Sequence, residues 1–180
     1  MNRRILVAGI GNIFLADDGF GCEVVRRLAE RELPAGVEVV DFGIRGLDLA
    51  YALMDGYEAI IFVDALPRGE DPGTVYLIEP EVEEVGDAAI DTHGMDPVKV
   101  LRFARAMGAE PTRTLVVGCE PQLVLSGEDY DDMLMELSES VRAAVPEAAK
   151  LVESLVKKIL TAAPIETPKP DDCARKEVRP

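Results

Sequence analysis

The chain has 180 residues, 48% hydrophobic and 29% charged, a composition typical of one soluble globular domain with a sizeable core. Its 34 acidic and 19 basic residues give a formal net charge of -15, which disfavours binding to nucleic acids and anionic membranes. The three cysteines are widely separated and form no CxxC pair, which favours a reducing compartment. No apolar stretch has the length of a signal peptide or a membrane helix. We therefore expect a cytoplasmic protein.

Short apolar runs alternate with longer amphipathic stretches along the chain. The first half predicts a strand over 4–10, a helix over 18–33, a strand over 37–42, a helix over 47–54 and a strand over 59–65. The last of these is the most apolar, so we expect it at the centre of the sheet. The second half predicts a strand over 74–78, a helix over 96–107, a strand over 114–119 and helical structure over 130–158.

Two prolines refine these helices. Pro97 suits the first position of a helix. Pro146 lacks an N–H and predicts either a kink or the start of a second helix. Beyond residue 160, prolines and mixed charges indicate a disordered tail. We therefore divide the chain into an α/β domain over 1–160 and a tail over 161–180.

The alternation of strands and helices predicts a mostly parallel five-stranded sheet with helices on both faces. The turn between the third and fourth strands is short enough for a hairpin, so we expect the fourth strand to be antiparallel. In such sheets ligands lie at the carboxyl ends of the strands. The residues that follow these ends are Asp17 and Asp18, Asp64, and Glu120, and His93 precedes a helix.

Each of these polar residues has a structural and a functional interpretation. Asp17 and Asp18 are most simply N-caps of the following helix. Asp64 interrupts an apolar run, where an unpaired carboxylate is costly, and this favours a functional role. His93, the single histidine, suits a ligand as well as a structural residue. Glu120 is interpreted as a solvated strand end.

Together, Asp18, Asp64 and His93 form a set of two carboxylates and one imidazole that suits nickel, zinc or manganese. Other sites are poorly supported. The GxG after the first strand has Phe14 where a dinucleotide fingerprint requires glycine. The chain has no HExxH motif and no GxSxG elbow. Cys119 near His93 is better interpreted as a small buried strand residue.

The same residues carry a family resemblance. The segments are, in order, 5–12 (ILVAGIGN), 15–21 (LADDGFG), 41–46 (DFGIRG), 62–65 (FVDA), 72–74 (PGT), 93–95 (HGM) and 118–121 (GCEP). This ordered set resembles the hydrogenase maturation endopeptidases over about residues 4–160. The chain departs from the family in having Asp18 where many members have glutamate, and in the sequence at 42–45.

The resemblance implies a three-layer αβα sandwich around a mostly parallel five-stranded sheet. It implies an endopeptidase that removes the C-terminal extension of a nickel-loaded nickel–iron hydrogenase large-subunit precursor. The family's metal-contacting and catalytic positions fall on Asp18, Asp64 and His93, and the nickel is expected to arrive with the substrate.

Two other classes of function remain open at this point. One is a self-sufficient metallohydrolase of the same fold that binds its own zinc or manganese. The other is a module that escorts nickel or the precursor without cutting it. The oligomeric state is not predicted.

Overall fold

The computed structural model describes residues 3–80, 97–109, 113–126 and 133–162. Its strands are β1 (Ile5–Ile10), β2 (Val37–Gly43), β3 (Ala59–Ala65), β4 (Val75–Ile78) and β5 (Arg113–Cys119). Its α-helices are α1 (Phe20–Ala29), α2 (Gly46–Ala52), α3 (Pro97–Ala106) and α4 (Glu139–Thr161). Two short 3-10 helices, η1 (Ala16–Gly19) and η2 (Leu53–Asp55), precede α1 and follow α2.

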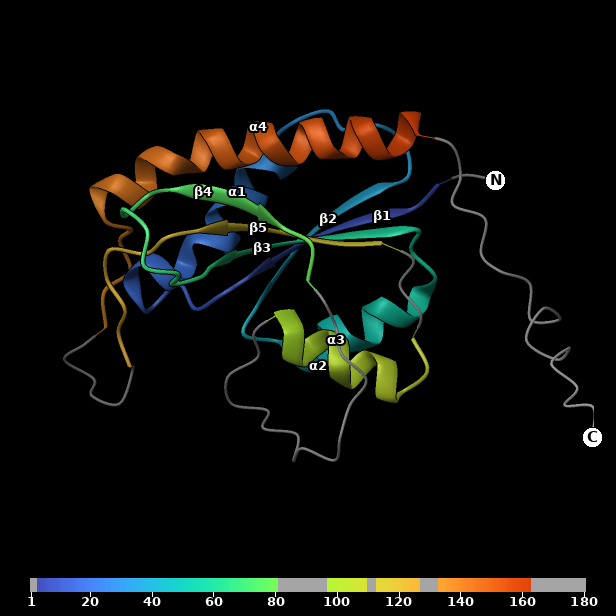
Figure 1. Cartoon of the computed structure of the whole chain (residues 1–180), viewed down its shortest axis with the longest axis horizontal. Helices are drawn as coiled ribbons and strands as arrows, with labels where there is room; N and C mark the ends of the chain where they lie inside the picture. Colours follow the sequence, from blue (N-terminus) through green and yellow to red (C-terminus); the bar gives the residue numbers. More distant parts are fainter. Residues whose placement is uncertain (1–2, 81–96, 110–112, 127–132, 163–180) are drawn as a thin grey trace, which may run out of the picture.

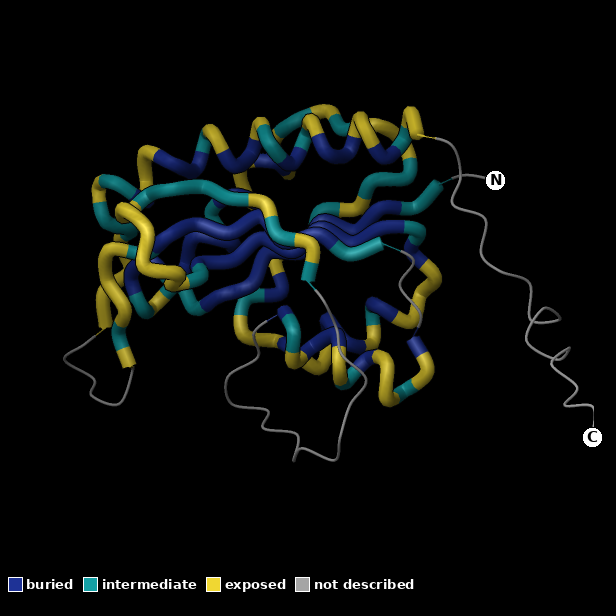
Figure 2. The backbone as a smooth tube through the Cα atoms, in the orientation of Figure 1, coloured by how far each residue is buried: buried dark blue, intermediate teal, exposed yellow. Residues whose placement is uncertain are grey.

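The strands form one five-stranded sheet in the order β2-β1-β3-β5-β4. Helices α1 and α4 cover one face, and α2 and α3 cover the other (Figure 1). In Figure 2 the inner strands β1, β3 and β5 are mostly buried between these layers, whereas the edge strands β2 and β4 are mostly half-buried. Helix α4 turns a buried side to the sheet and an exposed side outward. The predicted three-layer α/β fold is therefore confirmed, and β3 lies at its centre, as its apolar sequence predicts.

The topology corrects one step of the prediction. β4 is antiparallel, as expected, but it pairs with β5 and not with β3. β5 lies between them and is parallel to β3 over all seven residues of each strand. The hairpin prediction is wrong because β5 competes for the same edge of β3, and its Leu115, Val116 and Val117 bury a wholly apolar surface there.

Two helices have other bounds than the sequence predicts. α1 begins at Phe20, after the 3-10 turn η1, and ends at Ala29, with Glu30 as its C-cap. α4 begins at Glu139, where the Ser138 side chain accepts from the Val141 N–H. α4 then passes through Pro146 as a single helix, so the alternative of a second helix starting there is wrong. α3 is described from Pro97 onward. The residues before it lie outside the described ranges, so the place of Pro97 at the first position of the helix stays a prediction. The predicted tail lies outside the described residues beyond 162.

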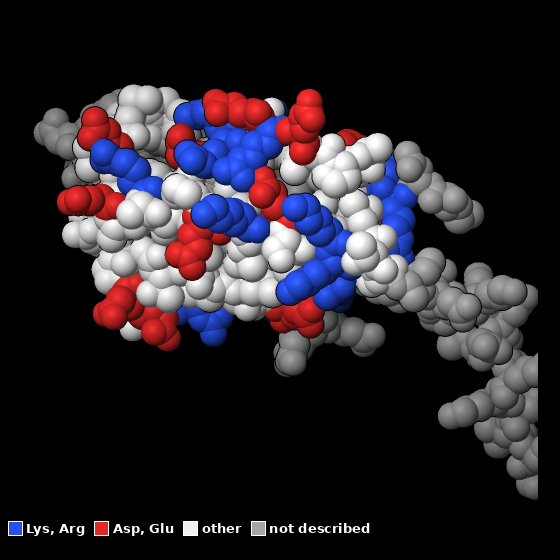
Figure 3. Space-filling view, turned by 90° about the horizontal axis from the view of Figure 1, so that it is seen from above, with Lys and Arg blue, Asp and Glu red and all other residues white. Residues whose placement is uncertain are grey.

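The surface is less uniformly acidic than the net charge suggests. Figure 3, which looks onto the α4 face, shows Lys and Arg side chains across its middle with acidic side chains among them. Arg26 pairs with Glu23 at 2.9 Å on α1, and Arg31 pairs with Glu153 of α4. Among the described residues, no helix is long and apolar enough to cross a membrane.

Candidate functional site

The carboxyl end of the parallel sheet brings together the loop after β1 and the end of β3. η1, which carries Asp17 and Asp18, contacts β3. The Asp18 side chain is half-buried, and its Oδ2 accepts the Asn12 N–H at 2.6 Å. Its Oδ1 has no hydrogen-bond donor among the described residues. Burial raises the pKa of Asp18 above its ordinary value, and the Asn12 N–H opposes that rise.

The main chain around Asp18 has an unusual local conformation. Gly11 has a φ of 129°, and a Cβ there would lie 1.8 Å from the Asp18 carbonyl oxygen, so this close approach requires glycine. Ala16 has a φ of 50°, which costs an L-residue about 1–2 kcal/mol. Its N–H donates to the Leu134 carbonyl at 2.6 Å. Strain of this kind is retained where surrounding contacts enforce it, often at functional sites.

Asp64 lies at the end of the central strand and is 5% exposed. Along β3, Ile60 and Phe62 belong to the core under α2 and α3, whereas Ile61 and Val63 belong to the other core. Side chains alternate along a strand, so Asp64 lies on the α2 and α3 face. The sequence prediction of a carboxylate buried at this edge is confirmed.

Asp64 has a tyrosine near it that sequence reasoning missed. Asp64 pairs with Gly118 of β5, and Gly118 pairs with Tyr76 of β4, so the three form one row across the sheet. A Cβ on Gly118 would lie 2.4 Å from Tyr76 Cε2, because the Tyr76 ring covers the glycine. The ring therefore extends over β5 toward the Asp64 strand, and its hydroxyl donates to the Leu66 carbonyl.

Asp17 is a structural carboxylate and not a helix cap. It is fully buried, and Oδ2 accepts the N–H groups of Gln122 and Leu123, both at 2.8 Å. Oδ1 accepts the Ser138 N–H at 2.6 Å. Neither Asp17 nor Asp18 caps η1 or α1, so the cap interpretation is wrong. Asp17 instead ties the loop after β1 to the loop after β5 and to the start of α4.

Glu120 is likewise buried, at 5% exposure, and is not a solvated strand end. Its carboxylate accepts the Arg68 N–H at 2.7 Å and the Gly69 N–H at 3.1 Å, and so holds the loop after β3. Burial alone would raise the pKa of Glu120, but the backbone N–H groups outweigh it and lower the pKa. Asp17 and Glu120 thus fasten both sides of the rim around Asp18 and Asp64.

The two described cysteines are buried thiols. Cys119 belongs to the core on the α1 and α4 face, opposite to the face of Asp64, so its interpretation as a buried strand residue is confirmed. Burial, with the charges of Asp17 and Glu120, raises its pKa to about 12. Burial and a hydrogen bond with Asp41 raise the pKa of Cys22 to about 12 as well. Neither thiol is suited to nucleophilic catalysis.

His93, the third predicted site residue, lies outside the described residues, in the segment before α3. Within the part of the chain that the structure describes, no three His, Cys, Asp or Glu side chains form a metal-binding group. The described geometry therefore brings the loop of Asp18 and the strand of Asp64 to one rim. Two carboxylates there can hold a divalent cation or position a water molecule.

The residues that sequence reasoning missed or misassigned, Asp17, Tyr76 and Glu120, act through partners far along the chain. Asp17 bonds groups 105, 106 and 121 residues away. No periodicity or local motif signals such contacts. The one available clue is the clustering of acids after apolar strands, and it does not separate a structural carboxylate from a catalytic one.

Comparisons with known proteins agree with this architecture. A family model described as hydrogenase maturation protease matches residues 22–155. A putative hydrogenase maturation protease of Methanocaldococcus jannaschii is 34% identical over 160 residues, covering 87% of this chain and 98% of that protein. The hydrogenase expression/formation protein HupD of Rhizobium leguminosarum bv. viciae is 33% identical, covering 95% and 81%.

Solved structures give the same result. The hydrogenase maturating endopeptidase HybD from E. coli superposes with a TM-score of 0.67 at 26% identity, covering 87% of this chain and 93% of that one. The hydrogenase 2 maturation peptidase from Thaumarchaeota archaeon SCGC_AB-539-E09 superposes with a TM-score of 0.65 at 34% identity, covering 86% of this chain and 99% of that one. With its sheet order, its rim of carboxylates and these relatives, the chain belongs to the hydrogenase maturation protease family and is an endopeptidase.

Proposed function

We propose that this endopeptidase removes the C-terminal extension of a nickel–iron hydrogenase large-subunit precursor, and that Asp18, Asp64 and His93 engage the nickel already loaded in that substrate. The nickel is thus part of the substrate. The precursor is the partner that membership of the family implies, and the choice of cleavage point belongs to the proposal.

The observation that carries the proposal is the pair of carboxylates at one rim of the sheet. Asp18 Oδ2 is occupied by the Asn12 N–H at 2.6 Å, whereas Oδ1 has no donor among the described residues and remains available to a cation. Asp64 is 5% exposed and lies at the carboxyl end of the central strand, beside the loop that carries Asp18. Two carboxylates and one imidazole leave coordination positions open and suit divalent nickel.

Such a partial ligand set explains why the protein would act only on a loaded precursor. Three ligands of this kind bind a free ion moderately, and a nickel already held by the substrate completes the contact. The metal then provides Lewis acidity or a fixed reference point for the scissile peptide. Cleavage becomes conditional on loading without any separate sensor.

The test is cleavage of purified precursor, with and without nickel, followed by the mass of the product. We expect the wild-type chain to cut only the loaded form. Asp18→Asn, Asp64→Asn and His93→Ala should each lower the rate by about 100-fold or more. Asp48→Asn is the matched control, since Asp48 is an exposed acid on α2 with a 61% exposed side chain.

Two results would contradict the proposal. Equal cutting of the nickel-free precursor would show that the three residues do not read the metal. Cutting of short unrelated peptides with a stoichiometric zinc or manganese bound to the purified chain would favour the self-sufficient metallohydrolase.

A further inference from the structure

A cavity of about 360 Å³ lies on the α2 and α3 face of the sheet, beside the rim described above. Its walls come from the loop after β3, from β4 and β5, and from the start of α3, and include Leu66, Arg68, Ile78, Pro97, Val98 and Val116. All but Arg68 are apolar. A cavity of about 150 Å³ holds a benzene ring, so this one has room for a large apolar side chain together with some main chain.

The strand register gives the position of this cavity relative to Asp64. Phe62, Val116 and Ile78 form one row across β3, β5 and β4, and Asp64, Gly118 and Tyr76 form the next row on the same face. Successive rows on one face are about 7 Å apart, and neighbouring strands about 4.8 Å. The cavity wall at Val116 is therefore roughly 8 Å from the Asp64 position, a distance that two to three extended residues span.

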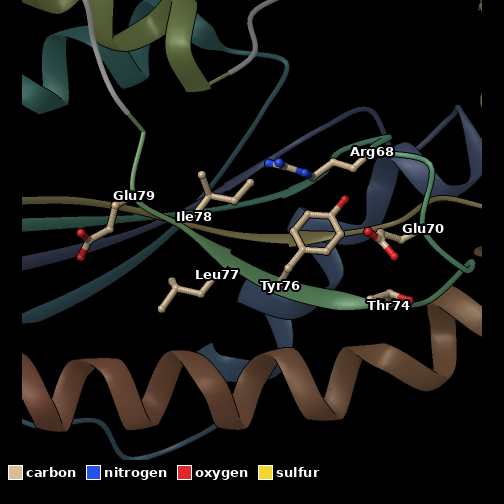
Figure 4. A pocket seen from close by; sticks show the side chains of 7 residues that line it. All are labelled: Arg68, Glu70, Thr74, Tyr76, Leu77, Ile78 and Glu79. Atoms are coloured by element: carbon tan, nitrogen blue, oxygen red, sulfur yellow. The ribbon is translucent and has the colours of Figure 1, made fainter.

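Arg68 stands at the junction of this cavity with a second one. Arg68 and Ile78 also line a cavity of about 490 Å³ that includes Thr74, Tyr76 and Leu77 (Figure 4). In Figure 4 the Arg68 side chain extends along the same side of β4 as the Tyr76 ring and Ile78. Its guanidinium carbon lies 5.7 Å from the centre of that ring, within the range of a cation–π contact.

The main chain at Arg68 is held in place, and its guanidinium contacts the Tyr76 ring. Glu120 holds the main chain at Arg68 and Gly69, and no carboxylate pairs with the guanidinium within the described ranges. An arginine in this state has several N–H donors to offer to an oxygen of an incoming ligand. Glu70 and Glu79 line the second cavity, and their charges disfavour an acidic side chain there.

We propose that the 360 Å³ cavity is a subsite for the polypeptide substrate: it receives an apolar side chain two to three residues from the scissile bond, while Arg68 donates to a main-chain carbonyl of the same segment. The inference rests on the proposed function, since it places the substrate next to Asp64. The negative charges of Glu70 and Glu79 disfavour a small anion as the ligand. The distance of roughly 8 Å between the cavity wall at Val116 and Asp64 suits a neutral, extended peptide that reaches both.

The test fills the cavity. Val98 is half-buried on α3 and lines the cavity, whereas Arg102 lies one turn further along the same helix and is exposed. In cleavage of nickel-loaded precursor, Val98→Trp should lower kcat/KM at least tenfold, while Arg102→Trp should stay within about twofold of wild type. Loss of a methylene from a hydrophobic subsite changes kcat/KM by about 10- to 200-fold, so the assay resolves the effect.

A substrate scan supplies the matched measurement. Each apolar residue within three positions of the cleavage point is replaced with alanine in the precursor. At one of these positions the alanine substitution should lower kcat/KM of the wild-type enzyme by about tenfold or more. The same substitution should lower kcat/KM of the Val98→Trp enzyme by less than about threefold, because the filled cavity can no longer contact that side chain.

The outcomes separate the inference from the function on which it rests. If the wild-type chain cuts no loaded precursor, the proposed function fails and the subsite with it. If it cuts, but Val98→Trp behaves like Arg102→Trp or shows no coupling to any substrate position, only the subsite is overturned. A melting temperature for Val98→Trp more than about 5 °C below that of Arg102→Trp would show that the chain fills the cavity itself, and would also overturn the subsite.

Discussion

Replacing Asp17 with alanine removes the single acceptor of three main-chain N–H groups, those of Gln122, Leu123 and Ser138. A hydrogen bond to a charged group contributes about 1.5–3 kcal/mol, and a buried donor left without a partner costs its desolvation. Water entering the vacated space would restore part of this loss. We therefore expect the free energy of unfolding to fall by about 3–5 kcal/mol, which for a domain of this size lowers the melting temperature by about 6–20 °C.

Urea unfolding followed by circular dichroism measures this difference by linear extrapolation. Asp17→Asn should lie between wild type and alanine, because the amide keeps one acceptor oxygen but turns its NH2 toward the donors. Asp48→Ala is the control: it also removes one negative charge, but its partner Arg45 is 3.5 Å away on the exposed surface, and the change should be below about 1 kcal/mol. If Asp17→Ala fell within 1 kcal/mol of this control, the account of the rim would be refuted.

Three further predictions follow from the same region. Gly118→Ala places a Cβ 2.4 Å from Tyr76 Cε2, and since the ring is tethered to Leu66, unfolding free energy should fall by about 1–3 kcal/mol; an unchanged urea midpoint would contradict this. The lowered pKa of Glu120 means that its ionised form stabilises the fold above the unfolded pKa of about 4.3, a contribution lost as pH falls through the lower folded value. Urea unfolding measured from pH 7 to pH 3 should therefore show that the free energy of unfolding falls less with decreasing pH in Glu120→Gln than in the wild type. An equal fall in the two proteins would be evidence against this role of Glu120. With pKa values of about 12, Cys22 and Cys119 should resist iodoacetamide at pH 8 in the native protein and react in urea, as mass spectrometry of tryptic peptides would show.

Much of the fold follows from local patterns. The seven-residue run Ala59–Ala65 forms a strand with the predicted bounds and lies at the centre of the sheet, because a continuous apolar run can be buried on both faces. Residues 30–33 show the limit of such patterns, since amphipathic spacing continues there after the helix has ended at Ala29.

The candidate site could be predicted in part. Asp64 was recognisable because a carboxylate within an apolar strand is energetically conspicuous. Asp18 was singled out through the order of motifs that carry the family resemblance. The structure confirms that Asp18 and Asp64 lie at one rim, whereas the site role of Asp18, Asp64 and His93 stays a prediction. The structural role of Asp17 was not accessible from the sequence, since its three N–H partners lie 105, 106 and 121 residues away along the chain.

The amino-acid sequence by itself thus determined the elements, the α/β class and the gathering of acids at one edge, because period, apolar runs and helix signals act over a few residues. Only the tertiary structure decided that β5 separates β3 from β4. It also decided that the Asp17 and Glu120 carboxylates accept hydrogen bonds from main-chain N–H groups, and that Tyr76 lies over Gly118 beside Asp64. These outcomes depend on which distant segments compete for the same strand edge or the same carboxylate, and that competition is resolved by packing rather than by local pattern.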